Sequence, residues 1–371
     1  MYRVVAVVLC ASYAFAQTPQ SPQELLKQAV AAQQAGNLDD AIRGYRNLLE
    51  KYPNIALIRS NLGAALAAKG EYANAIAEYE RALKAEPNPQ VRLNLALAYY
   101  KAGDIPSTVN TLQQVRKELP SNMQAVTVLA DCYLKLGENQ SVVDLLTPIQ
   151  QAHPDDQSFT YLLGTALVRS GQTNKGEVII DKILRDGDSA QARLLMGTTK
   201  LMVRDFSGAR DDFQKAVEMN PSLPDVYAYY GLALLTTGDQ AGAKTAFQRE
   251  LTTDPNNFDA NLRMGVLLRQ DEDNDTALKY FDHALQVRPG DPGVRYQIAV
   301  VELSKGELDQ AQRDLEALVK QSPNFTEAHV SLATVYFREK RKDDGQRERA
   351  IVAKLNAAKQ ADEPAVKAAN P

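Results

Sequence analysis

Cysteine is nearly absent from this chain of 371 residues, which contains only Cys10 and Cys132. Cys10 lies in an apolar N-terminal segment that we expect to be removed, so Cys132 would have no internal disulfide partner. The sequence also lacks a C-x-x-C pair, a G-x-S-x-G elbow and a glycine-rich phosphate loop. These absences exclude a disulfide framework and give no support to the common redox, hydrolase or nucleotide-binding sites.

An excess of positive charge is also lacking. The chain has 42 Lys and Arg against 46 Asp and Glu, a formal net charge of −4, and loss of Arg3 with the N-terminal segment would make it −5. A protein that binds nucleic acid usually carries a basic face. We therefore expect no nucleic-acid partner.

Residues that could hold a metal are scattered. The three histidines, His153, His283 and His329, have no second histidine or cysteine three or four positions away. The acidic run 271–275 begins like a calcium loop, but Thr276 stands where the turn needs glycine and Asp282 where the loop needs glutamate. We expect no metal, no cofactor and no catalytic residue.

What the sequence does contain is a long internal repeat. Eight prolines recur at spacings of 33 or 34 residues with one gap of 67: Pro53, Pro87, Pro120, Pro154, Pro221, Pro255, Pro289 and Pro323. Each proline closes a stretch with two helical patterns, so the repeated unit is a helix-turn-helix. Repeats of this length stack on their neighbours and form α-solenoids.

Two columns of the repeat describe how its helices cross. A helix that lacks bulk at the contact point lets its partner approach closely, and larger side chains fill the remaining space. The eighth position is always small: Ala29, Gly63, Ala96, Ala130, Gly164, Gly197, Gly231, Gly265, Ala299 and Ala333. The twenty-fourth position is large and apolar in the first nine units: Tyr45, Tyr79, Leu112, Leu146, Ile180, Phe213, Phe247, Phe281 and Leu315. Glycines near position fifteen are suited to the left-handed turn that ends the first helix.

At these positions the chain resembles the tetratricopeptide repeat family, whose pattern is L-G-x-x-Y, then A-x-x-x-F, then A and P. The segment NLGAALAAKGEYANAIAEYERALKAEP at 61–87 matches nearly every position. The resemblance implies an all-α fold, a right-handed superhelix of about ten helix-turn-helix units. It also implies a non-enzymatic scaffold that binds a protein or peptide.

The repeats predict one array over residues 22–359. Its units begin near 22, 56, 89, 123, 157, 190, 224, 258, 292 and 326, and the tenth is a degenerate cap with Lys340 and Arg349 in altered columns. Residues 17–21 form a short linker and 360–371 a flexible tail. The stretch 185–189, where Asp188 replaces the proline, is either a hinge or ordinary drift of the repeat.

The N-terminus predicts export. Residues 1–16 carry Arg3, a short apolar run and Ala14-Phe15-Ala16, which is the pattern of a secretory signal peptide cleaved near Ala16. The run is too short to span a bilayer. A lipid-modified Cys10 is the alternative, although Leu9 does not fit it. We expect a periplasmic or extracellular protein with no membrane span.

A second stripe of the first helices, at positions two, five, nine and twelve, lies about 130° from the core stripe. In the family this stripe lines the concave face, and here it is an apolar floor with a polar margin, as a peptide groove requires. The predicted groove residues are Leu93, Leu97, Tyr100, Leu134, Tyr161, Val168, Leu194, Leu201, Leu232, Leu235, Leu262, Val266, Arg269, Tyr296, Val300 and Leu303. Part of this stripe could instead seal one repeat to the next.

The sequence leaves three functional classes open. The first is an exported adaptor for a protein or peptide in envelope assembly, secretion or polysaccharide export, with the partner unidentified. The second is a glycan-binding or enzyme-accessory module that presents Tyr100, Tyr161 and Tyr296. Catalysis is the third, and no constellation of residues supports it. The family's carboxylate clamp needs Lys and Asn at positions five and nine, and this chain has neither there.

Overall fold

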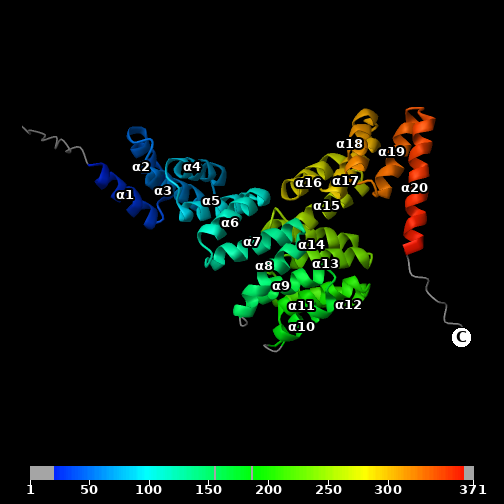
Figure 1. The fold of residues 1–371 in the computed structure, drawn as a ribbon, viewed down its shortest axis with the longest axis horizontal. Helices are drawn as coiled ribbons and strands as arrows, with labels where there is room; N and C mark the ends of the chain where they lie inside the picture. Colours follow the sequence, from blue (N-terminus) through cyan, green and yellow to red (C-terminus); the bar gives the residue numbers. More distant parts are fainter. Residues whose placement is uncertain (1–20, 154–155, 185–186, 363–371) are drawn as a thin grey trace, which may run out of the picture. The chain divides into compact units, whose positions relative to one another are not determined.

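The computed structural model describes residues 21–153, 156–184 and 187–362, and within these ranges the chain forms twenty α-helices and no strand (Figure 1). The first ten helices are α1 (Pro22–Gln34), α2 (Leu38–Lys51), α3 (Ala56–Ala68), α4 (Tyr72–Ala85), α5 (Pro89–Ala102), α6 (Ile105–Glu118), α7 (Met123–Leu136), α8 (Asn139–Ala152), α9 (Gln157–Arg169) and α10 (Thr173–Leu184). The others are α11 (Ala190–Met202), α12 (Phe206–Met219), α13 (Val226–Thr236), α14 (Gln240–Thr253), α15 (Phe258–Gln270), α16 (Asn274–Val287), α17 (Pro292–Lys305), α18 (Leu308–Gln321), α19 (Thr326–Arg338) and α20 (Lys342–Asp362).

The helices form ten consecutive pairs, which confirms the predicted all-α solenoid. The predicted signal peptide, residues 1–16, lies outside the described residues, and so does the tail from 363 onward. Helix α20 continues to Asp362, three residues into the segment predicted to be a tail. None of the described helices is both long enough and apolar enough to cross a membrane. The predicted domain boundaries stay a prediction.

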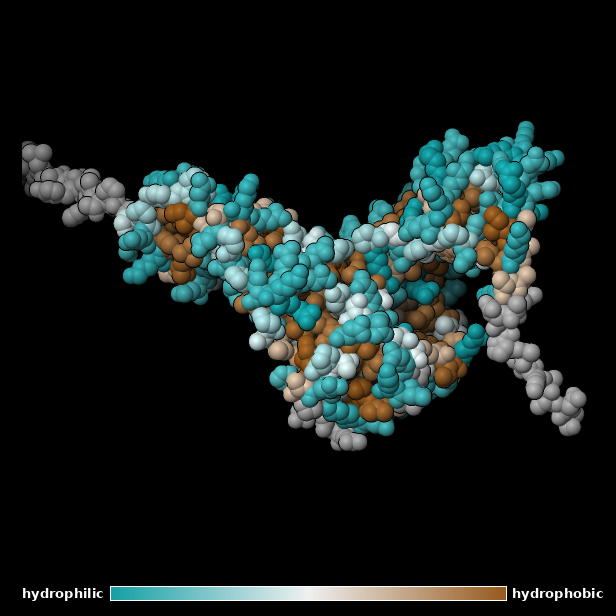
Figure 2. Space-filling view, in the orientation of Figure 1, coloured by the Kyte–Doolittle hydropathy of each residue, from teal (hydrophilic) through white to brown (hydrophobic). Residues whose placement is uncertain are grey.

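The helices group into two compact units. Unit 1 comprises α1–α5 and residues 117–120, and unit 2 comprises residues 103–116 and the chain from Ser121. In Figure 2 the face in view carries many hydrophilic residues together with several patches of hydrophobic ones. The fully buried side chains are mostly apolar.

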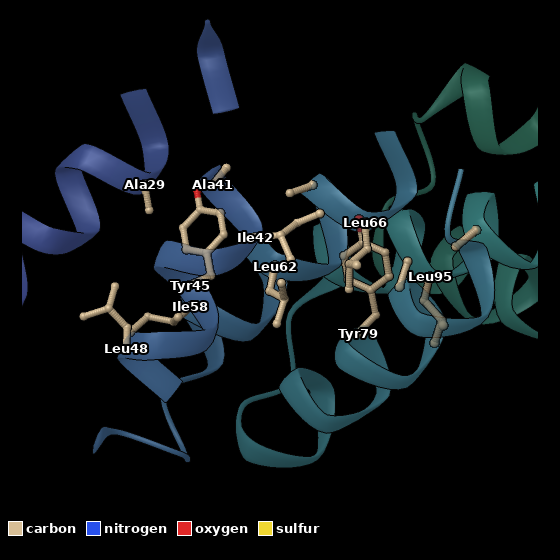
Figure 3. Close-up of a cluster of buried hydrophobic side chains, with 13 residues drawn as sticks. Ala29, Ala41, Ile42, Tyr45, Leu48, Ile58, Leu62, Leu66, Tyr79 and Leu95 are labelled. Atoms are coloured by element: carbon tan, nitrogen blue, oxygen red, sulfur yellow. The ribbon is translucent and has the colours of Figure 1, made fainter. Parts of the chain in front are cut away.

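The core of unit 1 illustrates how a pair of helices packs. Figure 3 shows Tyr45 and Tyr79 pointing from α2 and α4 into clusters that include Leu62 and Leu66 of α3. Tyr45 is fully buried, and its hydroxyl donates to Gln33 Oε1 at 2.7 Å. Because a buried tyrosine needs a partner for its hydroxyl, this bond allows the ring to lie in the core.

The small residue at position eight is matched to the large residue at position twenty-four. In four repeats a Cβ added to the glycine would lie under 3.0 Å from an aromatic ring: Gly63 against Tyr79, Gly197 against Phe213, Gly231 against Phe247 and Gly265 against Phe281. Two repeats of unit 2 with leucine at position twenty-four have alanine at position eight: Ala130 with Leu146 and Ala299 with Leu315. In the four repeats with a ring against glycine, close packing leaves no room for an added methyl group, whereas the first repeat accommodates both Ala29 and Tyr45.

The turn inside each pair has one conformation throughout the described chain. Position fifteen has a positive φ in all ten pairs, with glycine in seven of them: Gly36, Gly70, Gly103, Gly137, Gly171, Gly238 and Gly306. Arg204, Glu272 and Lys340 occupy the other three, at φ of 63°, 65° and 64°. The predicted left-handed turn is confirmed, and it persists where a side chain makes it costly.

The stretch predicted to be a hinge falls partly outside the described residues, which omit 185 and 186. Gly187 has a φ of 109°, and Asp188 forms an ion pair with Arg193 at 2.6 Å. The Ser189 hydroxyl accepts from Ala192 N and caps α11. These contacts define the start of α11, and the hinge remains a prediction.

Candidate functional site

The sixteen residues predicted to line a groove are all at least partly buried. Leu93, Leu97 and Tyr100 lie on α5 in unit 1, and the other thirteen lie in unit 2. Four of the sixteen are almost inaccessible: Leu93 (1 %), Leu134 (6 %), Val168 (0 %) and Leu194 (3 %). These four belong to the packed interior of a single chain.

The remaining twelve keep some contact with solvent. Three consecutive first helices of unit 2 each carry two half-buried aliphatic side chains from this set: Leu232 and Leu235 on α13, Leu262 and Val266 on α15, and Val300 and Leu303 on α17. These side chains of the stripe are thus neither fully buried nor fully exposed. Whether it is a binding surface or a seal between repeats stays a prediction.

The tyrosines of the stripe take part in packing. The Tyr296 ring lies 5.2 Å from the Phe325 ring at an interplanar angle of 52°, and its hydroxyl is 3.3 Å from Ser331 Oγ. Tyr161 packs against the cluster that contains Phe213. These contacts engage part of two of the three tyrosines, and the glycan-binding alternative stays a prediction.

Unit 2 contains a cavity of about 280 Å³. Two predicted groove residues, Leu134 and Leu232, line it together with charged and polar residues that the repeat pattern does not single out. The rest of the lining is Gly137, Asn139, Arg169, Asp225, Ala228, Tyr229, Asp259, Arg263 and Arg288. The walls come from α7, α8, α9, α13 and α15 and from the ends of two helices, so the cavity joins repeats that are distant in sequence.

Long-range bonds hold the walls together. Arg169 Nη2 bonds Asp225 Oδ2 at 2.9 Å, and its Nε donates to the Tyr229 hydroxyl at 2.6 Å. Lys135 forms an ion pair with Asp254, 119 positions along the chain. Half-buried pairs of this kind, reinforced by additional hydrogen bonds, position side chains more firmly than exposed pairs do.

Arg288 reaches the same cavity from the end of α16. Its guanidinium carbon lies 3.7 Å from the centre of the Phe258 ring, and its Nε donates to the Lys135 carbonyl at 2.5 Å. Burial lowers the pKa of Arg288, and nearby Asp259 and Asp291 only partly oppose this effect. The structure therefore keeps a guanidinium in a place that disfavours its charge.

A buried glutamate builds the wall at the start of α13. Glu250 on α14 is 4 % exposed, and its carboxylate accepts from the backbone N–H groups of Asp225, Tyr227 and Ala228 at 3.1–3.3 Å. Asp225, the N-cap residue of α13, has a φ of 64° and makes no capping bond of its own. Glu250 thus caps α13 from a neighbouring helix, and the Asp225 side chain is left to bind Arg169.

Two buried glutamates are shifted in their protonation. Burial and the neighbouring Asp225 raise the pKa of Glu250 to about 7, and the backbone N–H bonds oppose the rise. Burial and Asp314 raise the pKa of Glu302 on α17 to about 7 as well. Both side chains are buried between helices, where the Glu250 carboxylate accepts hydrogen bonds from backbone N–H groups.

Glu250 stands out in the repeat pattern, although it belongs to no chemical motif. Position twenty-seven of the repeat is Leu48, Ala82, Val115, Ile149, Ile183, Ala216, Ala284 or Leu318 in the other units before the cap, and Glu250 in the seventh. A carboxylate in an otherwise apolar column indicates a buried polar partner. The arginines of the cavity carry no comparable signal, because their columns vary.

The scattered candidates for metal ligands have structural roles or are exposed. His329 is buried, with Nε2 2.9 Å from the Pro323 carbonyl and Nδ1 beside Glu348, whereas His153 and His283 are exposed. Asp273 of the acidic run caps α16 by accepting from Thr276 N at 3.2 Å. In the part of the chain that the structure describes, no three His, Cys, Asp or Glu side chains are grouped to hold a metal.

Comparisons with known proteins agree with this architecture. A tetratricopeptide repeat family model matches residues 26–90, 194–258 and 296–365, together more than half of the chain, and a second one matches 268–313. The model for subunit 3 of the anaphase-promoting complex, or cyclosome, matches residues 68–149. A search of curated proteins gave no match.

Solved structures are similar in fold at low identity. The crystal structure of the APC/C hetero-tetramer Cut9-Hcn1 covers 91 % of this chain and 88 % of its own, with 14 % identity and a TM-score of 0.52. A double mutant of MamA covers 47 % and 99 % at 20 % identity and a TM-score of 0.42, and MamA itself 44 % and 96 % at 19 % and 0.39. With its paired helices, small crossing residues and left-handed turns, the chain belongs to the tetratricopeptide repeat family.

Proposed function

We propose that this protein is an exported, non-enzymatic scaffold that binds a protein partner through the stripe of its first helices. The family itself suggests a scaffold for protein interaction. The observation that carries the proposal further is the run of half-buried aliphatic side chains on α13, α15 and α17. A cell-envelope assembly, secretion or polysaccharide-export machine is the setting that we infer for it.

The half-buried stripe has the character of an interface. Leu262 and Val266 lie on the same helix as the fully packed Met264 and Leu267, yet they retain contact with water. Covering apolar surface contributes about 25 cal/mol per Å², so a partner segment laid along these helices would gain from each of them. Asp225 and Asp259, at position two, form the polar margin of this surface.

The ionisable groups support a non-enzymatic role. The two carboxylates whose pKa values are raised to about 7 are buried, Glu250 at 4 % exposure and Glu302 at 9 %. Glu250 spends its oxygens on backbone N–H groups, so it is not available to a substrate. The net charge of −4 likewise favours a protein over a nucleic acid.

The proposal of export rests on residues 1–16 of the sequence. Cleavage near Ala16 would leave Gln17 as the first residue of the mature protein. Fractionation of the producing cells followed by mass spectrometry of the N-terminus tests this. A chain that begins at Met1 in the cytosol would contradict the proposal, and a lipid on Cys10 would favour the alternative.

The scaffold role is tested by loss of partner binding. Cross-linking in the native envelope with mass spectrometry first identifies the partner. The double variant Leu262→Gln, Val266→Gln should then weaken partner capture at least tenfold while helicity is retained. Val178→Gln is the matched control, because Val178 is an exposed aliphatic residue, 67 % accessible, on α10, the second helix of its repeat and therefore outside the stripe. Equal capture by wild type and double variant would refute binding through this stripe.

A further inference from the structure

We propose that the cavity of unit 2 binds the carboxylate of an acidic residue in the partner, with Arg263 and Arg288 as its counter-ions. This inference deepens the proposed function and rests on it. It assigns the cavity a ligand class, an Asp or Glu side chain with its adjoining peptide group, and its two counter-ions are not among the predicted groove residues.

The guanidinium groups of the lining differ in whether they already have a carboxylate partner. Arg169 is bound to Asp225 and to the Tyr229 hydroxyl. Arg288 uses Nε for a backbone carbonyl, and neither it nor Arg263 has a carboxylate within 4.0 Å among residues 21–153, 156–184 and 187–362. Two guanidinium groups therefore face the cavity with donors to spare, and a guanidinium is the best protein partner for a planar carboxylate.

The charges on the cavity lining are only partly paired. The cavity is lined by three arginines and two aspartates, and Asp225 is paired with Arg169. Arg288 stacks on Phe258 and sits in surroundings that disfavour its charge. An anion placed beside it would relieve this cost, because opposite charges interact more strongly where water is excluded.

The cavity lining also contains hydrogen-bond acceptors. Asn139 Oδ1 is buried and accepts no hydrogen bond from any described residue, and the carboxylate of the exposed Asp259 lies on the same lining. Buried acceptors without a donor are costly, so a well-matched ligand brings an N–H group next to its carboxylate. A peptide residue supplies this group, whereas a simple organic acid does not.

The size and the apolar part of the lining fit one residue. A volume of about 280 Å³ holds a side chain and its peptide group and is too small for a folded element. Leu134, Ala228 and Leu232 supply apolar contact for the methylene groups of the side chain. An acidic residue of a bound peptide could thus enter the cavity while the flanking chain runs over the surface.

The test uses leucine methyl NMR of the full chain, with Leu134 and Leu232 as reporters inside the cavity. The probes are N-acetyl-glutamate N-methylamide, the corresponding glutamine compound and glutarate. We expect the glutamate compound to shift both reporters with a dissociation constant in the millimolar range, and the other two to bind at least tenfold more weakly. High salt should weaken the binding, since an ion pair carries it.

Two variants decide the assignment. Arg263→Gln and Arg288→Gln should each weaken binding of the glutamate compound at least fivefold, and Arg249→Gln, which removes an exposed arginine of α14, should leave it unchanged. The Arg263 side chain makes no hydrogen bond to a described residue, so its replacement tests the idea even if Arg288→Gln disturbs the fold.

Three results would overturn the inference: equal binding of the glutamine compound, equal binding of glutarate, or undiminished binding by Arg263→Gln. Equal binding of the glutamine compound would mean that no carboxylate is needed, and equal binding of glutarate that no peptide group is needed. Undiminished binding by Arg263→Gln would mean that Arg263 is not a counter-ion. Partner capture through Leu262 and Val266 is measured separately, so the scaffold proposal can survive the loss of this one.

Discussion

The second and seventh repeats share one crossing and differ in how a helix begins. In the second repeat, α3 and α4, Gly63 lies against Tyr79 and position twenty-seven is the buried Ala82. In the seventh, α13 and α14, Gly231 lies against Phe247 in the same way, but position twenty-seven is Glu250. The crossing is kept while the polar content of the core changes.

The difference shows what the repeat tolerates. The helix crossing depends on shape, so any pair of small and large residues that fills the volume is accepted. A buried carboxylate is accepted only because four donors surround it, three backbone N–H groups and Asn257 Nδ2. In the seventh repeat Glu250 caps the start of α13, and the Asp225 side chain can therefore bind Arg169 across the cavity.

Removal of the buried carboxylate should give the largest effect. Glu250→Leu leaves the amides of Asp225, Tyr227 and Ala228 without an acceptor, and we expect a loss of about 3–5 kcal/mol in the stability of this region. Hydrogen exchange at Tyr227 and Ala228 should accelerate, while amides of α3 and α4 stay protected. Glu250→Gln keeps one oxygen and should cost less. Unchanged protection at Tyr227 in the leucine variant would contradict the capping role.

The matched pair at the crossing should give the next effect. Gly231→Ala places a methyl group about 2.7 Å from the Phe247 ring, and we expect it to destabilise by about 1–3 kcal/mol despite alanine's better helix propensity. Adding Phe247→Leu should recover part of the loss, because the leucine repeats already carry alanine there. Chemical denaturation of the four proteins measures the coupling. Strict additivity would argue against size matching.

The two regions should also differ in their response to pH. The folded state holds the Glu250 proton more tightly than the unfolded chain, since its pKa is raised from 4.5 to about 7. Stability should therefore fall as pH rises through this window and be lowest above it. We expect a higher melting temperature near pH 6 than near pH 8, with a smaller difference in Glu250→Gln. Adding Glu302→Gln to Glu250→Gln should reduce this difference in melting temperature further. A rise in melting temperature between these pH values would contradict both assignments.

Helix capping should give the smallest effect. Asp239 caps α14 by accepting from Gly242 N at 2.8 Å, whereas Glu71, at the same place before α4, makes no capping bond. Asp239→Ala should cost about 1 kcal/mol, and Glu71→Asp should gain a few tenths at most. Thermal unfolding by circular dichroism measures both. A loss of stability in Glu71→Asp would show that its ion pair with Lys69 matters more than the cap.

The fold could be predicted from the sequence because its determinants are local. The residues that set the helix crossing and the left-handed turn, at positions eight, fifteen and twenty-four, lie within one repeat. The geometry of each repeat is therefore determined by its own sequence. Lys135 meets Asp254 only because small rotations add up over several repeats, and no pattern within one repeat records that sum. The repeat pattern therefore does not predict the cavity, although Glu250 in an otherwise apolar column indicates a buried polar group near it.

The pairing of a bare glycine with a ring limits how such arrays can be rebuilt. If one half of a repeat were transplanted without the other, a ring would meet a methyl group or a glycine would face a hole. Duplication and recombination should thus preserve both halves together, with breakpoints between repeats. Engineers who recombine modules of this chain should treat Gly265 and Phe281 as a single inherited part.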